Sequence, residues 1–180
     1  MSPTAFFQQL INGLTLGGMY ALVALGYTMV YGIIQLINFA HGEIFMIGAF
    51  LGLTIMHLLG RLGVSDGFAL GAAFAGSMIV TGIAGVAIER IAYRPLRHSP
   101  RITLLLSAVG MSIFLQNLIM LLYSRDMQPF PHAISGGFNL KGVIIDNIQI
   151  FIIISSLLLM VALDLLVQKT RLGQAMRAIA

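Results

Sequence analysis

Four polar side chains lie inside the most apolar part of the chain, and they are its first candidates for chemistry. They are Gln35, Asn38, His41 and Glu43. Glu43 is the only charged residue before Arg61. A charge at the middle of a bilayer costs roughly 2.5–3.5 kcal/mol on insertion scales, so such a group faces protein, water or a pathway. We therefore expect the functional site in this segment.

The spacing of these side chains allows three interpretations. In a structural one, Asn38 and His41 satisfy backbone groups where a helix is broken. In the second, the break is functional, because non-helical backbone at membrane depth persists only beside protein or a water-filled cavity, and transporters line their paths with discontinuous helices. In the third, His41 and Glu43 are a general acid/base pair or metal ligands, although side chains two positions apart on a helix point in different directions. No nucleophile motif or second His/Glu cluster supports this third interpretation, so we expect no catalytic residue, metal or cofactor.

The composition defines the class of protein. Hydrophobic residues make up 58% of the chain and charged residues only 9%, with a mean hydropathy of +0.96, which excludes a water-soluble domain. The absence of cysteine excludes disulfides and thiolate metal sites. The sequence therefore predicts an all-α, polytopic helical membrane protein.

About 20 apolar residues are needed to cross a bilayer as a helix, and this length predicts five transmembrane helices. We expect them at about 7–32, 44–59, 67–88, 103–123 and 148–167, with boundaries good to about four residues. A broken-helix region near 33–43 separates the first two. The fourth span carries several small or polar groups that suit an inward face, namely Ser107, Gly110, Ser112, Gln116 and Asn117.

Basic residues orient the spans, because loops retained in the cytoplasm carry excess Lys and Arg. One cluster lies in the connection after the third span and comprises Arg90, Arg94, Arg97 and Arg101. A second lies in the tail, with Lys169, Arg171 and Arg177. Two spans separate the clusters, so both are expected in the cytoplasm and the N-terminus outside. The net charge of +4 is thus a topology signal and does not indicate a nucleic-acid partner.

Four long segments resemble a known family, the permease subunits of ATP-binding-cassette importers for branched-chain amino acids. They are GGMYALVALGYTMVYGIIQLINFAHGEIFMIGA at 17–49, ERIAYRPLR at 89–97, SAVGMSIFLQN at 107–117 and TRLGQAMRAIA at 170–180. The resemblance covers nearly the whole chain, and several long matches in the same order are highly specific.

The resemblance implies a subunit with no catalysis of its own, in a multi-pass protein of the bacterial inner membrane. A periplasmic binding protein delivers the substrate, this chain and a second permease subunit form the path, and two cytoplasmic ATPase subunits drive transport. The resemblance assigns Asn38, His41, Gly42 and Glu43, with Gln35 beside them, to a broken helix next to the path. It assigns the tail to a coupling helix that docks on an ATPase, through Arg171, Gly173, Arg177 and Ala178.

Members of this family continue well past residue 180, so residues 1–180 are expected to be the N-terminal part of one permease transmembrane domain. Two other classes stay open on the residues alone: an intramembrane enzyme using His41 and Glu43, and a passive channel or scaffold. The sequence does not select among leucine, isoleucine and valine, other amino acids, amides and urea.

Overall fold

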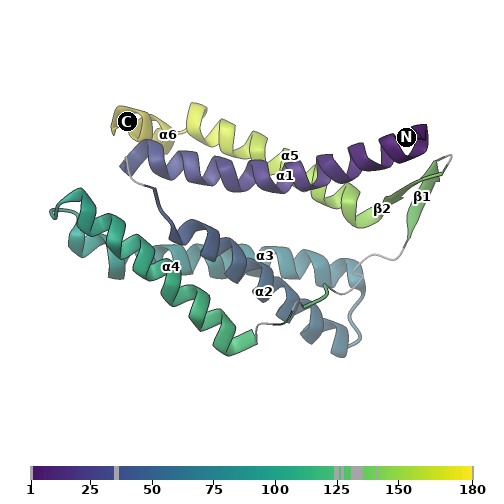
Figure 1. The fold of residues 1–180 in the computed structure, drawn as a ribbon, viewed down its shortest axis with the longest axis horizontal. Helices are drawn as coiled ribbons and strands as arrows, with labels where there is room; N and C mark the ends of the chain where they lie inside the picture. Colours follow the sequence, from purple (N-terminus) through teal and green to yellow (C-terminus); the bar gives the residue numbers. More distant parts are fainter. Residues whose placement is uncertain are drawn as a thin grey trace. The chain divides into compact units, whose positions relative to one another are not determined.

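A computed structural model describes residues 2–34, 37–123, 126, 128–130, 136–140 and 142–179. The chain divides into two compact units. Unit 1 comprises residues 1–35 and 134–180, and unit 2 comprises residues 36–133. Figure 1 labels the helices and strands of both units.

Unit 1 is built on two long helices, α1 (Pro3–Ile34) and α5 (Asn147–Lys169), which pack along each other. The short helix α6 (Arg171–Ile179) follows α5 and packs against it. The strands β1 (Gly137–Leu140) and β2 (Val143–Asp146) form an antiparallel hairpin that leads into α5. Asp146 and Gln149 form a reciprocal capping box at the start of α5, which satisfies backbone donors that a helix start leaves without partners.

Unit 2 contains α2 (Ala40–Arg61), α3 (Asp66–Ile88) and α4 (Arg101–Tyr123). Glycines bring α2 and α3 close together, as small residues do in membrane helices. A methyl group built on Gly52 would lie 3.3 Å from the Ser77 hydroxyl, and one on Gly76 would lie 2.8 Å from the end of the Ile55 side chain. Between α3 and α4 the chain forms a π-helical turn, η1 (Glu89–Tyr93), and a 3-10 turn, η2 (Arg94–Leu96).

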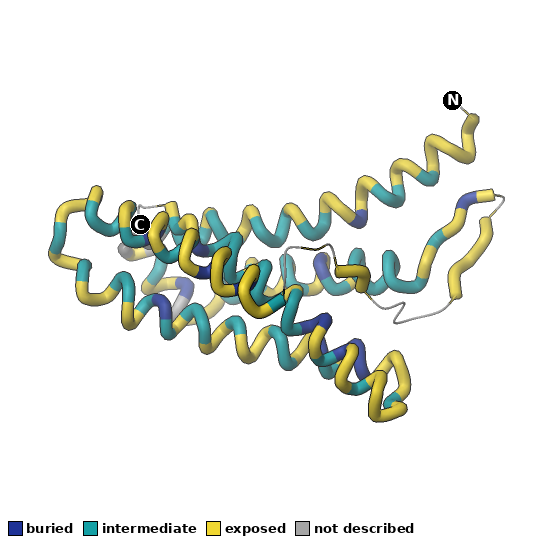
Figure 2. The backbone as a smooth tube through the Cα atoms, turned by 60° about the horizontal axis from the view of Figure 1, so that its bottom comes forward, coloured by how far each residue is buried: buried dark blue, intermediate teal, exposed yellow. Residues whose placement is uncertain are grey.

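The five predicted spans are confirmed. Among the described residues, five helices are long and apolar enough to cross a membrane, with mean hydropathies between 1.4 and 2.8. Much of their surface is exposed, as Figure 2 shows along each helix, and it includes large apolar side chains such as Leu121 at 85%. A helix surrounded by lipid has no need to bury such residues within its own chain.

The structure differs from the sequence-based expectations in three places. The hairpin lies in a connection for which no strands were predicted. The chain stays helical through η1 and η2, where a plain connection was expected after residue 88. The broken-helix region, expected near 33–43, gives way to helix α2 already at Ala40, so His41 and Glu43 lie in the first turn of that helix while Asn38 precedes it.

Candidate functional site

The interruption between α1 and α2 is organised by Asn38. Its side-chain oxygen accepts a hydrogen bond from the backbone N–H of Ala40 at 3.2 Å, and its backbone oxygen accepts one from the N–H of His41 at 3.0 Å. The hydroxyl of Tyr93 donates to the same side-chain oxygen at 2.6 Å. Asn38 thus satisfies donors that the start of α2 would otherwise leave without partners, and it joins α2 to η1.

Glu43 joins α2 to α4. One carboxylate oxygen of Glu43 accepts hydrogen bonds from the Ser112 hydroxyl at 2.9 Å and from the Gln116 amide at 2.7 Å. The first turn of a helix favours a negative charge, and Glu43 occupies that turn of α2. Two donors and the helix dipole together stabilise a carboxylate in an apolar protein.

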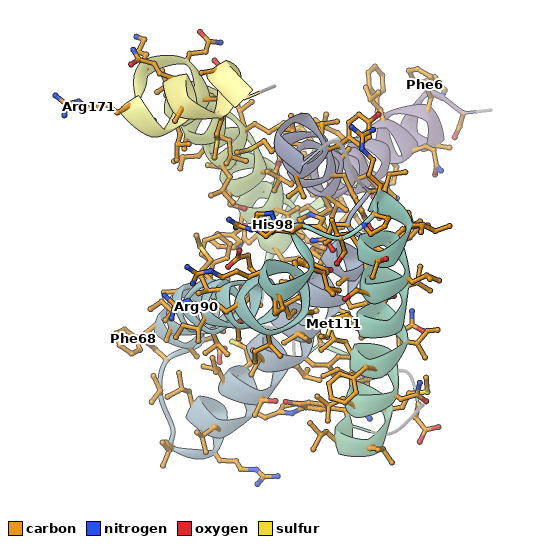
Figure 3. All side chains as sticks on the ribbon, turned by 90° about the vertical axis from the view of Figure 1, so that its left-hand side faces the viewer. Phe6, Phe68, Arg90, His98, Met111 and Arg171 are labelled. Carbon is orange, nitrogen blue, oxygen red and sulfur yellow. The ribbon has the colours of Figure 1, made fainter. Side chains whose placement is uncertain are left out.

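An apolar cluster supports this polar junction. Ala40 is fully buried and lies with Ile88 of α3 and Leu115 of α4 in one hydrophobic cluster. Ile47 and Met111 pack against the cluster, and Figure 3 labels Met111 on α4. The site is therefore held on packed helices of unit 2 rather than on a loose loop.

The remaining predicted residues of this segment lie close to Asn38 and Glu43 in the chain. His41 and Gly42 belong to the first turn of α2 and are half-buried. Gln35 lies outside the described residues. Within the part of the chain that the structure describes, no three His, Asp or Glu side chains gather as metal ligands would.

Sequence reasoning identified Ser112 and Gln116 as part of an inward face on span four, and the structure places both on Glu43. It missed Tyr93. A signal for this residue is present in the sequence, because Pro95 has no N–H and therefore disturbs the helical turn that ends at Tyr93.

The basic connection comprises residues 89–101. Arg97 forms an ion pair with Glu89. Arg90, Arg94 and Arg101 are exposed, and Figure 3 shows Arg90 and His98 on this segment.

The predicted coupling residues lie on α6, which follows α5 after an extended residue, Thr170, and packs against it. Thr170 caps the start of α6, since its hydroxyl accepts a hydrogen bond from the N–H of Gly173 at 3.1 Å. Gly173 is buried, and a methyl group there would collide with the carbonyl oxygens of Leu166 and Val167. Arg171 and Ala178 are exposed, and the Arg171 side chain extends away from the helix (Figure 3). The side chain of Arg177 lies outside the described part.

These features define a multi-pass helical membrane protein with a polar helix interruption in its apolar body. Residues 9–180 match the family described as the permease component of the branched-chain amino acid transport system, and the chain belongs to this family.

Curated relatives carry the same assignment. The chain is 48% identical, over 97% of its length, to the high-affinity branched-chain amino acid transport system permease protein BraD of Pseudomonas aeruginosa. It is 45% identical, over 97% of its length, to the corresponding protein LivH of Escherichia coli K12 and of Salmonella typhimurium. The chain spans 59% of the length of each of these relatives. No solved structure matches it.

Proposed function

We propose that this chain supplies five spans to a permease subunit of an ATP-driven importer for branched-chain amino acids. The observation that carries the proposal is the polar junction of Asn38 and Glu43 in a chain of the branched-chain permease family. The relatives named above are permease proteins of high-affinity branched-chain amino acid transport systems. Leucine, isoleucine and valine are therefore the substrates to test first, followed by other amino acids, amides and urea.

The chemistry of the junction suits an amino acid that passes it. The substrate carries an ammonium group, which needs acceptors, and a carboxylate, which needs donors. The Glu43 carboxylate is such an acceptor, and the start of α2 carries the positive end of a helix dipole. We place Gln35, Asn38, His41, Gly42 and Glu43 beside the translocation path.

The same proposal assigns α6 to coupling. A helix that is capped by Thr170 and seated through Gly173 is anchored firmly to α5, so a force applied to α6 reaches a membrane span. Arg171 and Ala178 are exposed and would contact an ATPase subunit, together with Arg177. Gly173 would shape the corner rather than touch the partner.

The assembly follows from these roles. We propose partners of four kinds: a second permease subunit, two cytoplasmic ATPase subunits, a periplasmic substrate-binding protein and the lipid of the inner membrane. ATP hydrolysis belongs to the ATPase subunits in this scheme, and the permease itself performs no catalysis. Residues 1–180 form the N-terminal part of its transmembrane domain.

The test is uptake of labelled leucine into proteoliposomes that contain the partners and this chain continued to the length of its relatives. We expect uptake that requires both ATP and the binding protein. Glu43→Gln should lower the initial rate by about tenfold, since a hydrogen bond to a charged group contributes roughly 1.5–3 kcal/mol. Asp164→Asn is the matched control, because Asp164 is a carboxylate near the far end of α5 that accepts from Gln168 one turn away.

Other outcomes would favour the rival classes, which no finding supports. Leucine flux without ATP would identify a channel. Turnover of a lipid or peptide that requires His41 and Glu43, in the absence of ATP, would identify an enzyme. Unchanged ATP-driven uptake in Glu43→Gln would remove this carboxylate from the path.

A further inference from the structure

The π-helical turn η1 has an identifiable cause. The N–H of Arg94 donates to the carbonyl of Glu89, five residues earlier, where an α-helix would use the residue four back. Pro95 follows directly, and its missing N–H interrupts the regular pattern. Ser107 of α4 donates to the Ala92 carbonyl at 3.2 Å, which supplies this turn with a donor from outside its own helix. Such turns are frequent at functional sites.

The turn changes where Tyr93 points. One extra residue in a helical turn rotates every later side chain around the axis, and Tyr93 is the last residue of η1. Its ring packs against the buried cluster of Ala40, Ile88 and Leu115. Its hydroxyl reaches Asn38 at 2.6 Å, across 55 positions of sequence.

Asn38 is held from two sides. Its side-chain oxygen accepts from Tyr93 on one side and from the N–H of Ala40 on the other. An asparagine with only the local bond could rotate about its own side-chain torsions, whereas the second bond fixes the oxygen against a packed tyrosine ring. The first turn of α2, which carries Glu43 toward Ser112 and Gln116, begins from this point.

We propose that Tyr93 is a positioning residue, which the π-turn aims at Asn38 so that α2 starts at Ala40 with Glu43 directed at α4. Tyr93 touches no substrate in this proposal and acts only through Asn38. The inference rests on the proposed function only for its consequence in transport, namely that the ERIAYRPLR segment sets the geometry beside the path.

Unit 2 provides a matched control. Tyr123 at the end of α4 makes a similar bond, 2.7 Å from its hydroxyl to the Thr54 hydroxyl on α2. The hydroxyl of Tyr93 is bonded to Asn38, just before the start of α2, whereas the hydroxyl of Tyr123 is bonded within α2. Tyr93→Phe and Tyr123→Phe therefore each remove one tyrosine hydroxyl, the first at the helix interruption and the second away from it.

The experiment is hydrogen–deuterium exchange of the full chain in lipid nanodiscs, followed on peptides covering residues 37–44 and 50–60. In Tyr93→Phe we expect exchange of the Ala40 and His41 amides to rise roughly threefold, as expected for the loss of one membrane-protein hydrogen bond. Tyr123→Phe should leave residues 37–44 unchanged. Asn38→Asp, which keeps an acceptor, should resemble the unsubstituted chain, and Asn38→Ala should exchange faster.

A double substitution separates positioning from general stability. In the Asn38→Ala background, Tyr93→Phe should have no further effect at residues 37–44. An additional increase there would overturn the proposal, as would unchanged exchange in Tyr93→Phe alone. A rise spread over α2, α3 and α4 would overturn it too, by making Tyr93 a general support of the fold. The measurement involves no uptake, so its result is independent of the permease assignment.

Discussion

Gly18 of α1 lies directly against Ser156 of α5. A methyl group on Gly18 would come within 2.6 Å of the Ser156 hydroxyl oxygen and 3.3 Å of its Cβ atom. Ser156 is only 3% exposed, and its hydroxyl is already bonded to the Ile153 carbonyl of its own helix. The close approach of the two longest helices in unit 1 therefore depends on the missing side chain of Gly18.

Gly18→Ala should consequently destabilise the packing of α1 on α5, by about 1–3 kcal/mol for an overpacked contact. Far-UV circular dichroism in detergent would follow the thermal midpoint. Gly13→Ala and Gly17→Ala are controls on the same helix, since no described atom lies within 4 Å of a methyl group built there. Adding Ser156→Ala to Gly18→Ala should restore part of the loss, and no restoration would place the strain elsewhere.

The side chain of Gln8 hydrogen-bonds the hairpin of unit 1 to α1. Gln8 of α1 accepts from the Ile144 N–H at 2.8 Å and donates to the Ile144 carbonyl at 2.9 Å, as a neighbouring strand would. An isolated two-stranded hairpin is marginal at best. Gln8→Ala should therefore raise the exchange rate of the Ile144 amide by about tenfold, since each lost bond contributes about 0.5–1.5 kcal/mol. Gln9→Ala, at the exposed neighbouring position, should not alter that rate.

The spans could be predicted because their signal is local. Apolar length alone decides whether a helix can cross a membrane, and the predicted ends fall within four residues of the observed ones for all of the helices α1 to α5. The hairpin gave a weaker signal, because each strand has only four residues and the turn depends on one glycine, Gly142, with φ of 93°.

The contacts of the candidate site could be predicted only in part. The sequence shows that Asn38 and Glu43 are polar residues in an apolar segment, and that the fourth span carries a polar face. It does not show which residues bond to them, because Tyr93 lies 55 positions from Asn38 and Gln116 lies 73 positions from Glu43. The spacing of Gly13 and Gly17 suggested close packing, yet Gly18 is the glycine that meets α5. The spacing of small residues indicates that one face of a helix can pack closely, but it does not indicate which neighbouring helix packs there.

Thr170 should control the start of α6. Its hydroxyl caps the N–H of Gly173, so Thr170→Ala should cost about 1 kcal/mol and speed exchange at residues 171–174. Thr170→Ser keeps the oxygen and should behave as the unsubstituted chain. If α6 is the coupling helix, Thr170→Ala should also weaken capture of the ATPase subunits in a pull-down. Weakened capture in Thr170→Ser as well would point to the methyl group rather than the cap.

The proposed topology can be tested directly because the chain contains no cysteine. We expect a membrane-impermeant maleimide added to spheroplasts to label Phe138→Cys and Leu62→Cys, which are exposed at 64% and 71%. His98→Cys, in the basic connection, should react only after the membrane is opened. Labelling of His98→Cys from outside would invert the orientation inferred from the arginines.

Glu43 and Gln116 should be energetically coupled. Replacing Glu43 by Leu leaves the Gln116 amide and the Ser112 hydroxyl without their acceptor, so the free energy of unfolding should fall by about 1–3 kcal/mol. Gln116→Leu in the Glu43→Leu background should cost less than Gln116→Leu alone, because the acceptor is already gone. A double-mutant cycle should return a coupling of about 0.6–1.7 kcal/mol, between the average and the largest value found for hydrogen bonds between membrane helices. The pair of Asn117→Leu with Glu43→Leu is the control, since Asn117 donates to the Ile113 carbonyl of its own helix. Equal coupling in both cycles would mean that the α2–α4 contact is supported by packing alone, with no contribution from the carboxylate.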